Sequence, residues 1–170
     1  MKIRPAHDSH AEVAARLWTE GYTGVAPGGR SVPYAPAEFL EAAREGRPFL
    51  AVEEEGTAGE AVDHQRTAGI VVFYPPGAGG RAVPLEGEAE LSRLVVAVGS
   101  RGRGVGCALV NHCTQLALVA GATGIVLWSR PYQTAAHRLY EAAGYRRVPE
   151  RDHEDADGSC LVFRLALRPR

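Results

Sequence analysis

Apolar residues recur along this chain with two different spacings, which separate the predicted helices from the predicted strands. A spacing of three or four residues predicts four helices, over residues 9–21, 36–45, 105–120 and 133–143. Ser9 followed three residues later by Glu12 has the form of a capping box at the start of the first helix. A glycine directly follows each of the other three, which is where a helix most readily ends.

Runs rich in β-branched and aromatic residues predict seven strands. They cover residues 2–4, 49–53, 67–74, 88–98, 125–128, 145–149 and 161–167. The second and third are expected to pair antiparallel across a polar turn. The fourth becomes increasingly apolar towards its end, as expected of a central strand that is covered on both faces. This mixed order of strands and helices predicts an α/β or α+β fold, in which helices cover a sheet.

Two long segments are too rich in glycine and proline to continue a helix or a strand. They lie at residues 21–35 and 75–87, and we expect both to form surface loops. Loops of this kind frequently shape a substrate pocket.

The composition is that of an ordinary globular chain and excludes several classes of protein. The 170 residues suffice for one domain, which we expect to span residues 1–170. The 19 basic and 20 acidic residues almost cancel, so no broad positive field is present to bind nucleic acid or an anionic membrane. No apolar run has the length of a membrane span or the form of a secretory signal, and we therefore expect a cytoplasmic protein.

Neither the cysteines nor the histidines indicate a disulfide framework or a metal site. Cys107, Cys113 and Cys160 form no paired motif, and we expect them to be small buried residues. His112 falls on the apolar side of its predicted helix, where a core histidine is more common than a metal ligand.

The segment from Arg101 to Gly106 is the clearest candidate for a binding site, because it joins a buried strand to a predicted helix. Its inner residues are Gly102, Arg103, Gly104 and Val105. Glycines let the backbone approach a ligand closely, a helix N-terminus offers unpaired N–H groups, and the arginines add positive charge. These features predict an anion site, with a pyrophosphate as the natural ligand.

Other phosphate-binding motifs fit this segment less well. A P-loop ends in GK[ST], which is missing here. A dinucleotide-binding loop requires a glycine where Cys107 stands, and it belongs to an early βαβ unit that this sequence does not have. The remaining alternative is a turn that only joins strand to helix, which the two arginines make less attractive.

The segment resembles the signature of the GCN5-related N-acetyltransferase (GNAT) family: Arg or Gln, two residues, Gly, one residue, then Gly or Ala. Arg101, Gly104 and Gly106 fill this pattern. Residues 94–96 resemble the apolar strand of the family, and residues 137–148 resemble its later helix and turn. The resemblance implies a mixed, largely antiparallel central sheet of six to seven strands, flanked by about four helices.

The resemblance also implies acetyl-CoA as the cosubstrate, with no metal. A bulge in the fourth strand would expose backbone groups to the pantetheine arm, at Val96, Ala97 and Val98. The strand at residues 125–128 would diverge to leave room for the thioester. Gln133 and Ala136 would contact the cofactor from the later helix, although Gln133 stands where the family often has asparagine.

Two residues are candidates for the acid and the base of acetyl transfer. Tyr140 aligns with the tyrosine that similar enzymes use to protonate the sulfur of CoA, and a phenol carries its proton at neutral pH. The alternative for Tyr140 is a buried residue on an apolar stripe. Glu90 matches the position that often holds the base, directly or through water, although the amine could instead lose its proton to solvent. We expect Glu88 to be a solvated strand start.

These features predict an N-acyltransferase that transfers an acetyl group from acetyl-CoA to a primary amine of a small molecule or peptide. Direct attack in a ternary complex is favoured, because no cysteine has a visible base beside it. The alternatives are a non-catalytic acyl-CoA sensor, which would not need Tyr140, and a nucleotide-binding module. The acidic residues between 152 and 157 could attract a cationic acceptor, although such a cluster is more often solvated. Edge pairing of the strand at 161–167 could form a homodimer.

Overall fold

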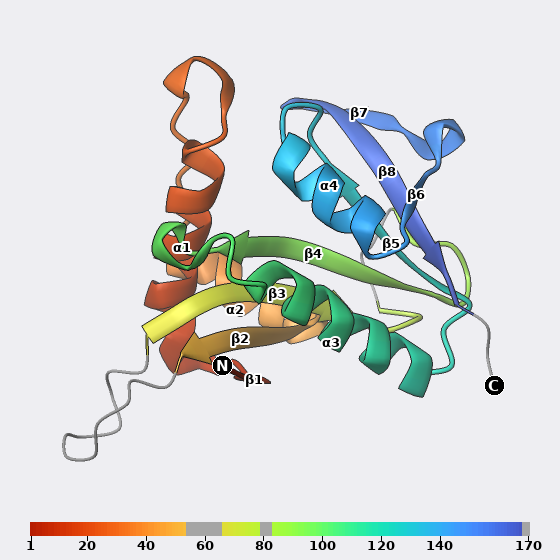
Figure 1. Cartoon of the computed structure of the whole chain (residues 1–170), viewed down its shortest axis with the longest axis horizontal. Helices are drawn as coiled ribbons and strands as arrows, with labels where there is room; N and C mark the ends of the chain where they lie inside the picture. The colour runs from red at the N-terminus through yellow and green to blue at the C-terminus, as the bar shows by residue number, and fades with distance from the viewer. Residues whose placement is uncertain (54–65, 79–82, 168–170) are drawn as a thin grey trace.

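A computed structural model describes residues 1–53, 66–78 and 83–167 of the chain (Figure 1). This part contains four α-helices, α1 (Ala11–Thr23), α2 (Pro36–Glu45), α3 (Val105–Val119) and α4 (Thr134–Ala142). Its strands are β1 (Lys2–Pro5), β2 (Arg47–Glu53), β3 (Arg66–Tyr74), β4 (Glu88–Val96), β5 (Gly124–Ser129), β6 (Arg146–Arg147), β7 (His153–Asp155) and β8 (Gly158–Ala166). The polar turn predicted after β2 lies at residues 54–65, outside the described residues.

The strands form one mixed sheet in the order β1-β2-β3-β4-β5-β8-β6, and β7 pairs with β8. Every described pair is antiparallel except β4 with β5. The expected largely antiparallel sheet is therefore confirmed, with eight strands in the described residues instead of six to seven. The additional strand, β7, has an acidic sequence without a strand pattern, and it forms because β8 supplies its hydrogen-bond partners.

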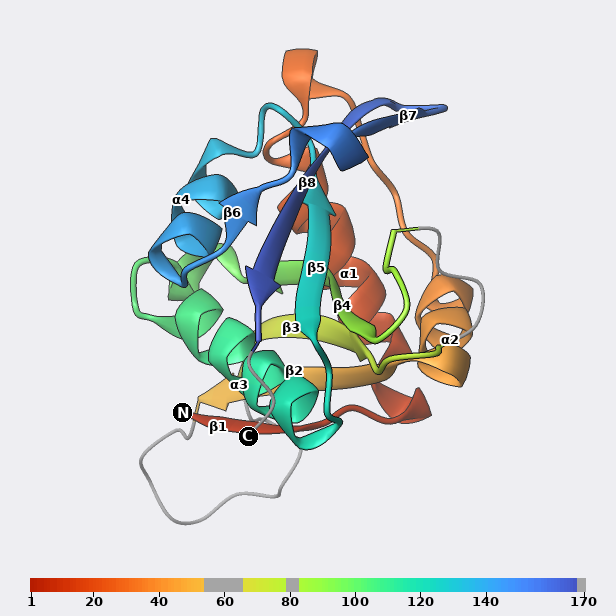
Figure 2. The ribbon, with the colours of Figure 1, turned by 90° about the vertical axis from the view of Figure 1, so that its right-hand side faces the viewer.

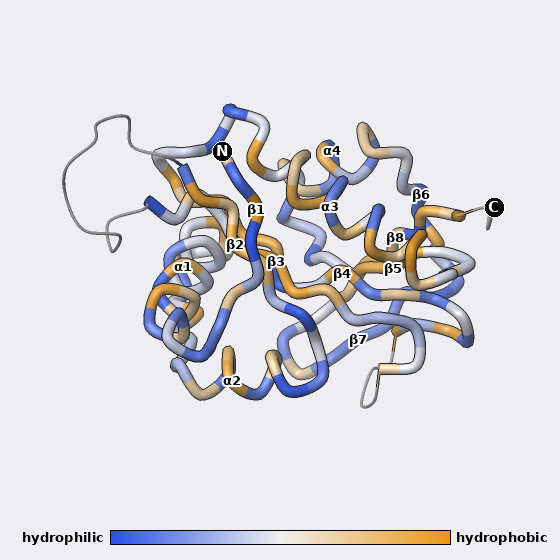
Figure 3. The backbone as a smooth tube through the Cα atoms, turned by 90° about the horizontal axis from the view of Figure 1, so that it is seen from below, coloured by the Kyte–Doolittle hydropathy of each residue, from blue (hydrophilic) through white to orange (hydrophobic). Residues whose placement is uncertain are grey.

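Helices cover both faces of the sheet. Figure 2 shows α1 and α2 on one face and α3 on the other, with α4 beside β6. Two buried apolar clusters result, one between the sheet and α1 and α2, the other under α3 and α4. The most hydrophobic parts of the chain lie along the central strands between these helices (Figure 3). This agrees with the apolar character predicted for the strand that became β4.

The beginning of α1 differs from the prediction. Residues Asp8–His10 form a 3₁₀ turn, and α1 starts at Ala11, so Ser9 does not cap it. Instead the ring nitrogen Nδ1 of His10 accepts a hydrogen bond from the N–H of His7, at 2.9 Å. The predicted capping box between Ser9 and Glu12 is therefore wrong, because Ser9 lies inside the 3₁₀ turn and His10 takes the N-cap position of α1.

The strand β8 lies inside the sheet. It pairs with β5 along Leu161 to Ala166 on one side, and with β6 and β7 on the other. Its backbone groups are therefore largely taken, and the prediction that residues 161–167 act as an edge strand is wrong. A second copy that paired along the whole of this strand would have to displace β6 and β7.

Candidate active site

The strands β4 and β5 run side by side only at the start of β4. Their parallel pairing extends from Glu88, opposite Gly124, to Glu90, opposite Val126. Beyond that point the two strands diverge (Figure 2). The predicted divergence of the strand at residues 125–128 is thus confirmed, and it leaves one side of β4 without a strand partner.

A bulge in β4 lies at Arg93 and Leu94. Between Ser92 and Val95, β4 advances by three residues while its partner β3 advances by two. Arg93 takes up the extra length with a φ of 52°, a left-handed value that residues with a side chain rarely adopt. The bulge predicted at residues 96–98 is therefore wrong in position, because the pairing with β3 resumes at Val95.

Backbone groups at the end of β4 alternate between the β3 side and the open side. The N–H of Ala97 donates to the carbonyl oxygen of Ala68 on the β3 side, at 2.9 Å. Since these groups alternate along a strand, the backbone groups of Leu94 and Val96 face the side that β5 has left. The carbonyl oxygen of Val96 accepts a hydrogen bond there from Nε of Arg101, at 3.3 Å. Leu94 and Val96, and not Ala97, offer backbone groups to a ligand.

The predicted anion site forms the N-terminal end of α3. Gly102 and Gly104 have φ values of 72° and 79°, which glycine adopts without strain. Gly104 is the N-cap of α3, and it has no side chain to bond the first N–H groups of the helix. Those groups have no partner within the helix and are oriented outwards. Val105 is buried and fixes the start of α3 against the sheet.

The two arginines of this segment have different surroundings. Arg103 forms an ion pair with Glu53, with 2.8 Å between Nη1 and Oε1. Arg101 is exposed and has no carboxylate partner among the described residues. A Cβ atom on Gly106 would lie 2.9 Å from a methyl group of Leu139, so the glycine lets α3 approach α4 closely. Arg101 therefore carries the charge that is available to an anion at this end of α3.

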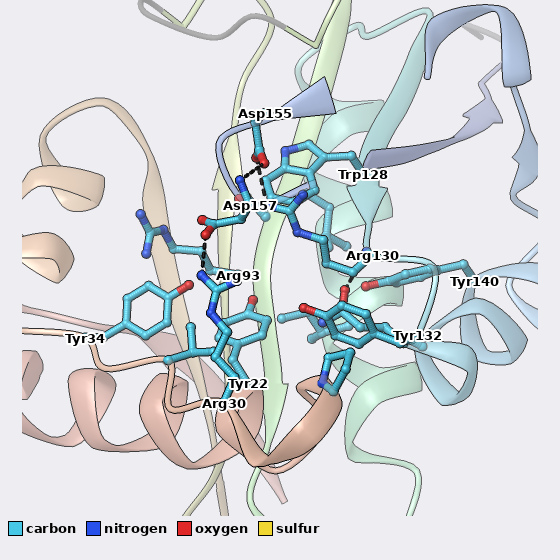
Figure 4. Close-up of a pocket in the computed structure, with 17 residues that line it drawn as sticks. Tyr22, Arg30, Tyr34, Arg93, Trp128, Arg130, Tyr132, Tyr140, Asp155 and Asp157 are labelled. Carbon is cyan, nitrogen blue, oxygen red and sulfur yellow. Dashed lines mark hydrogen bonds and ion pairs between the residues drawn. The ribbon is translucent and has the colours of Figure 1, made fainter. Parts of the chain in front are cut away.

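A cavity of about 430 Å³ lies between the β4 bulge, β5, α4 and the loop after α1 (Figure 4). We call it the central cavity. It is lined by Tyr22, Pro27, Arg30, Val32, Tyr34, Leu91, Ser92, Arg93, Leu94, Trp128, Arg130, Tyr132, Gln133, Ala136, Tyr140, Asp155 and Asp157. The first of the two predicted pocket loops, residues 21–35, thus contributes to this cavity. The described part of the second, residues 75–87, borders a separate hollow of about 220 Å³, and residues 79–82 lie outside the described residues.

Tyr140 is the predicted acid, and its hydroxyl group points into the central cavity (Figure 4). Its ring is buried, 6% exposed, and packs against Phe163 with 5.8 Å between the ring centroids. Burial raises the pKa of Tyr140 above the usual value of a phenol. Tyr140 therefore keeps its proton at neutral pH and has access to a ligand, which are the two requirements of a general acid.

Gln133 and Ala136 also line the central cavity, from the first turn of α4. The Oε1 atom of Gln133 accepts hydrogen bonds from the hydroxyl of Ser129 (2.9 Å) and the N–H of Arg130 (2.8 Å). Gln133 therefore holds the turn between β5 and α4, and only its NH₂ group is left to face a ligand.

Three arginines and two aspartates face the central cavity. Arg130 forms an ion pair with Asp155 (2.7 Å) and stacks on Trp128, while Arg30 forms an ion pair with Asp157. The hydrogen bond from Arg130 lowers the pKa of Asp155 to about 2. The two carboxylates that face the cavity are thus balanced by arginines, and Asp152 pairs with Arg147. Among the described residues, only Glu154 of the acidic cluster lacks an arginine partner, since it accepts from the hydroxyl of Ser159. Most of the charge that was expected to attract a cationic acceptor is therefore already paired.

Arg93 and Arg130 were not singled out by sequence. A charged residue within the run of residues 91–96 was the available signal for Arg93, because an arginine inside an otherwise apolar central strand needs a reason to be there. Nothing comparable marks Arg130, whose contacts come from the distant residues of β7 and β8.

The two candidate carboxylates of β4 are both buried. Glu90 is 1% exposed and is not among the residues that line the central cavity, although its neighbour Leu91 is. Glu88, which we expected to be solvated, is 4% exposed and bonds to Arg151 and Arg164. Glu88 therefore has a structural role, tying the start of β4 to the C-terminal part of the chain.

The cysteines and histidines provide no further site. Cys113 and Cys160 are buried as predicted, but Cys107 is exposed near the start of α3. His112 packs against the ring of Phe49, with 4.5 Å between centroids, as a core histidine would. No group of three or more potential metal ligands is found among the described residues. In the same part of the chain, no helix has the length and apolarity to cross a membrane.

Comparison with known proteins shows which family the chain belongs to. The model of the acetyltransferase (GNAT) family matches residues 15–145, more than half of the chain. The chain is 33% identical to N-acetylaspartate synthetase of Homo sapiens over 81 residues, which are 48% of this chain and 27% of that protein. The match thus spans about a quarter of the length of the human relative.

Solved structures show the same fold over almost the whole chain. A GCN5-related N-acetyltransferase from Kribbella flavida has a TM-score of 0.65 and 26% identity, covering 98% of this chain and 97% of that one. The ribosomal-protein-alanine N-acetyltransferase from Brucella melitensis has a TM-score of 0.66 and 18% identity, covering 98% and 100%. The chain belongs to the GNAT family of acetyltransferases. Acetyl transfer from acetyl-CoA is the chemistry of that family.

Proposed function

We propose that this protein is an N-acyltransferase that transfers the acetyl group of acetyl-CoA directly to a primary amine of a small molecule or peptide. One observation carries the proposal: the gap between β4 and β5 has the uncapped N-terminus of α3 at one end and a cavity with a buried tyrosine at the other. A cosubstrate with a pyrophosphate, a long polar arm and a reactive thioester fits such a gap. The name of the human relative specifies a product acetylated on nitrogen, which supports an amine acceptor.

The cofactor contacts follow from the same geometry. The pyrophosphate binds the N–H groups and positive charge between Arg101 and Gly106. The pantetheine arm adds a strand-like partner to the open side of β4, where Leu94 and Val96 offer backbone groups. Gln133 and Ala136 contact the arm from α4.

The chemical step needs an acid at the sulfur atom and a polarised carbonyl group. The amine nitrogen forms a bond to the carbonyl carbon of the thioester, and the carbon–sulfur bond breaks. The hydroxyl group of Tyr140 gives its proton to the departing thiolate, which leaves as the free thiol of CoA. The nitrogen loses one proton to solvent as the amide forms, and Tyr140 takes up a proton from solvent again. Backbone N–H groups of the β4 bulge stabilise the negative charge that develops on the carbonyl oxygen.

The amine must lose a proton before it attacks. We propose that Glu90 takes this proton through water, because it lies two residues before Ser92 on the same face of β4, and Ser92 lines the central cavity. Loss of the proton to solvent is the alternative. We also take residues 1–170 to be one N-acetyltransferase domain that works in the cytoplasm.

The proposal is tested by turnover. The wild-type protein is incubated with acetyl-CoA and a panel of primary amines, while free CoA thiol is followed with a thiol reagent and the product by mass spectrometry. Acetylated amine should form, and Tyr140→Phe should lower kcat by about 10- to 100-fold with little change in KM for acetyl-CoA.

The matched control is Tyr132→Phe, which removes the hydroxyl of a partly exposed tyrosine on the same cavity. It should retain near wild-type kcat. Binding of acetyl-CoA without transfer to any amine would favour the acyl-CoA sensor. Equal kcat values for Tyr140→Phe and the wild type would mean that Tyr140 is not the acid.

A further inference from the structure

The side chain of Arg93 faces the central cavity from a backbone position with a left-handed conformation. Its backbone has a left-handed φ of 52° in the β4 bulge. A residue with a side chain pays conformational free energy for such a geometry, which glycine would avoid. The indole N–H of Trp18 donates to the carbonyl oxygen of Arg93 at 3.1 Å and fixes the bulge. The fold thus maintains a strained position in order to present this arginine.

The guanidinium group of Arg93 lies over two aromatic rings. Its Cζ atom is 4.8 Å from the ring centre of Trp18 and 5.2 Å from that of Tyr34. The Nη1 atom is buried and has no hydrogen-bond partner in the described part of the chain. The rings orient the flat group and shield it from water, but they do not neutralise its charge.

The other charges on the wall of the central cavity are already paired. Arg30 is balanced by Asp157, and Arg130 by Asp155. Among the described residues, Arg93 forms no ion pair, so it leaves the cavity with one unbalanced positive charge. A shielded charge of this kind is strongly stabilised by an anion that reaches it.

We propose that the acceptor amine carries a carboxylate group, and that Arg93 binds this carboxylate. The inference rests on the proposed function and specifies its acceptor as a small amino acid. The planar guanidinium fork can donate two parallel hydrogen bonds to a carboxylate.

Tyr22 links the two ends of the acceptor site. Tyr22, Arg93 and Tyr140 all line the central cavity, and burial raises the pKa of Tyr22, so its hydroxyl group keeps its proton. An amino acid with its carboxylate on Arg93 therefore lies alongside Tyr22, with its amine towards the thioester end marked by Tyr140. The cavity volume of about 430 Å³ suits a small molecule.

An amine without a carboxylate should bind this site less well. Its ammonium form would meet the unbalanced charge of Arg93, while Asp155 and Asp157 are engaged by their own arginines. The site should therefore discriminate between amino acids and the corresponding amides, which share the same amine and side chain but lack the negative charge.

The test compares the twenty amino acids with their α-carboxamides as acceptors, by kcat/KM for release of CoA thiol. The wild type should favour the carboxylate member of its best pair by about 10- to 100-fold, the usual range for a hydrogen-bonded charge. Arg93→Gln should abolish this preference mainly through KM, and Arg93→Lys should restore part of it. Arg16→Gln is the matched control, because it removes an exposed arginine of α1 that does not line the cavity.

A merely structural role for Arg93 would lower the values for amino acids and amides equally, and that result would overturn the proposal. Equal use of both classes by the wild type would also overturn it while leaving acetyl transfer intact. If no acceptor is acetylated, the amino acids and their α-carboxamides are titrated into CoA-saturated protein by calorimetry, which tests the carboxylate site by binding alone. Amino acid binding that is lost in Arg93→Gln upholds the carboxylate site and rejects acetyl transfer, and absence of amino acid binding overturns the proposal.

Discussion

Glu88 should be one of the most important single charges for the stability of this fold. Its carboxylate accepts hydrogen bonds from Arg151 (2.8 Å), from Arg164 and from the N–H of Leu85 (3.0 Å). Burial raises the pKa of Glu88, but these donors outweigh it and lower the pKa from 4.5 to about 2. Such a shift corresponds to about 3 kcal/mol of preference for the charged form. Solvent reaches both arginines, which are 16% and 29% exposed, so screening leaves about 2 kcal/mol.

The substitution Glu88→Gln should therefore lower the free energy of unfolding by about 2 kcal/mol at pH 7. The measurement is urea denaturation of both proteins across pH, with Glu86→Gln as the control, since Glu86 is exposed two residues away. A lowered pKa stabilises the fold above the unfolded value of 4.5, and this contribution is lost as pH falls towards about 2. The difference between the wild type and Glu88→Gln should shrink over that interval. A difference below about 0.5 kcal/mol at pH 7, or one that does not change with pH, would refute the reasoning.

Two further predictions concern the base and the packing around the bulge. Glu90→Gln should reduce kcat/KM below pH 8 and recover as pH rises, because a more alkaline solution deprotonates the amine without help; a pH profile parallel to that of the wild type would assign this step to solvent. Gly21→Ala should lower the free energy of unfolding by about 1–3 kcal/mol, since a Cβ atom on this residue of α1 would lie 2.4 Å from a methyl group of Val95 in β4. Thermal unfolding checks it, and an unchanged midpoint would mean that α1 can move away from β4.

Local sequence signals were sufficient for the helices, for most strands and for the glycine turn that precedes α3. The helix at residues 36–45 could be predicted because Pro36 suits a first turn and Gly46 ends it, and both lie within the same few residues. The same holds for the loop from Arg101 to Gly106, whose glycines adopt the left-handed conformation that the pattern implies. Each of these features depends on residues close together in the chain.

The features that sequence missed depend on residues far apart in the chain. The position of the β4 bulge at Arg93 follows from its register with β3, which a single strand does not reveal. The ion pair between Arg30 and Asp157 joins residues 127 positions apart, and it balances a carboxylate that looks free in the sequence. Glu88 was expected to be solvated for the same reason, since its partner Arg164 is 76 positions away.

Binding of acetyl-CoA at the start of α3 is the central claim, and titration calorimetry tests it most directly. Acetyl-CoA, NAD and ATP are titrated into the wild type and into the double variant Arg101→Glu, Gly104→Asp. Arg16→Glu is the control, because it makes the same arginine-to-glutamate change at an exposed position of α1, on the opposite face of the sheet. The account predicts that acetyl-CoA binds in preference to the nucleotides, and that the double variant but not the control weakens it by at least about 10-fold. Undiminished acetyl-CoA affinity in the double variant, or a preference for NAD or ATP, would contradict it.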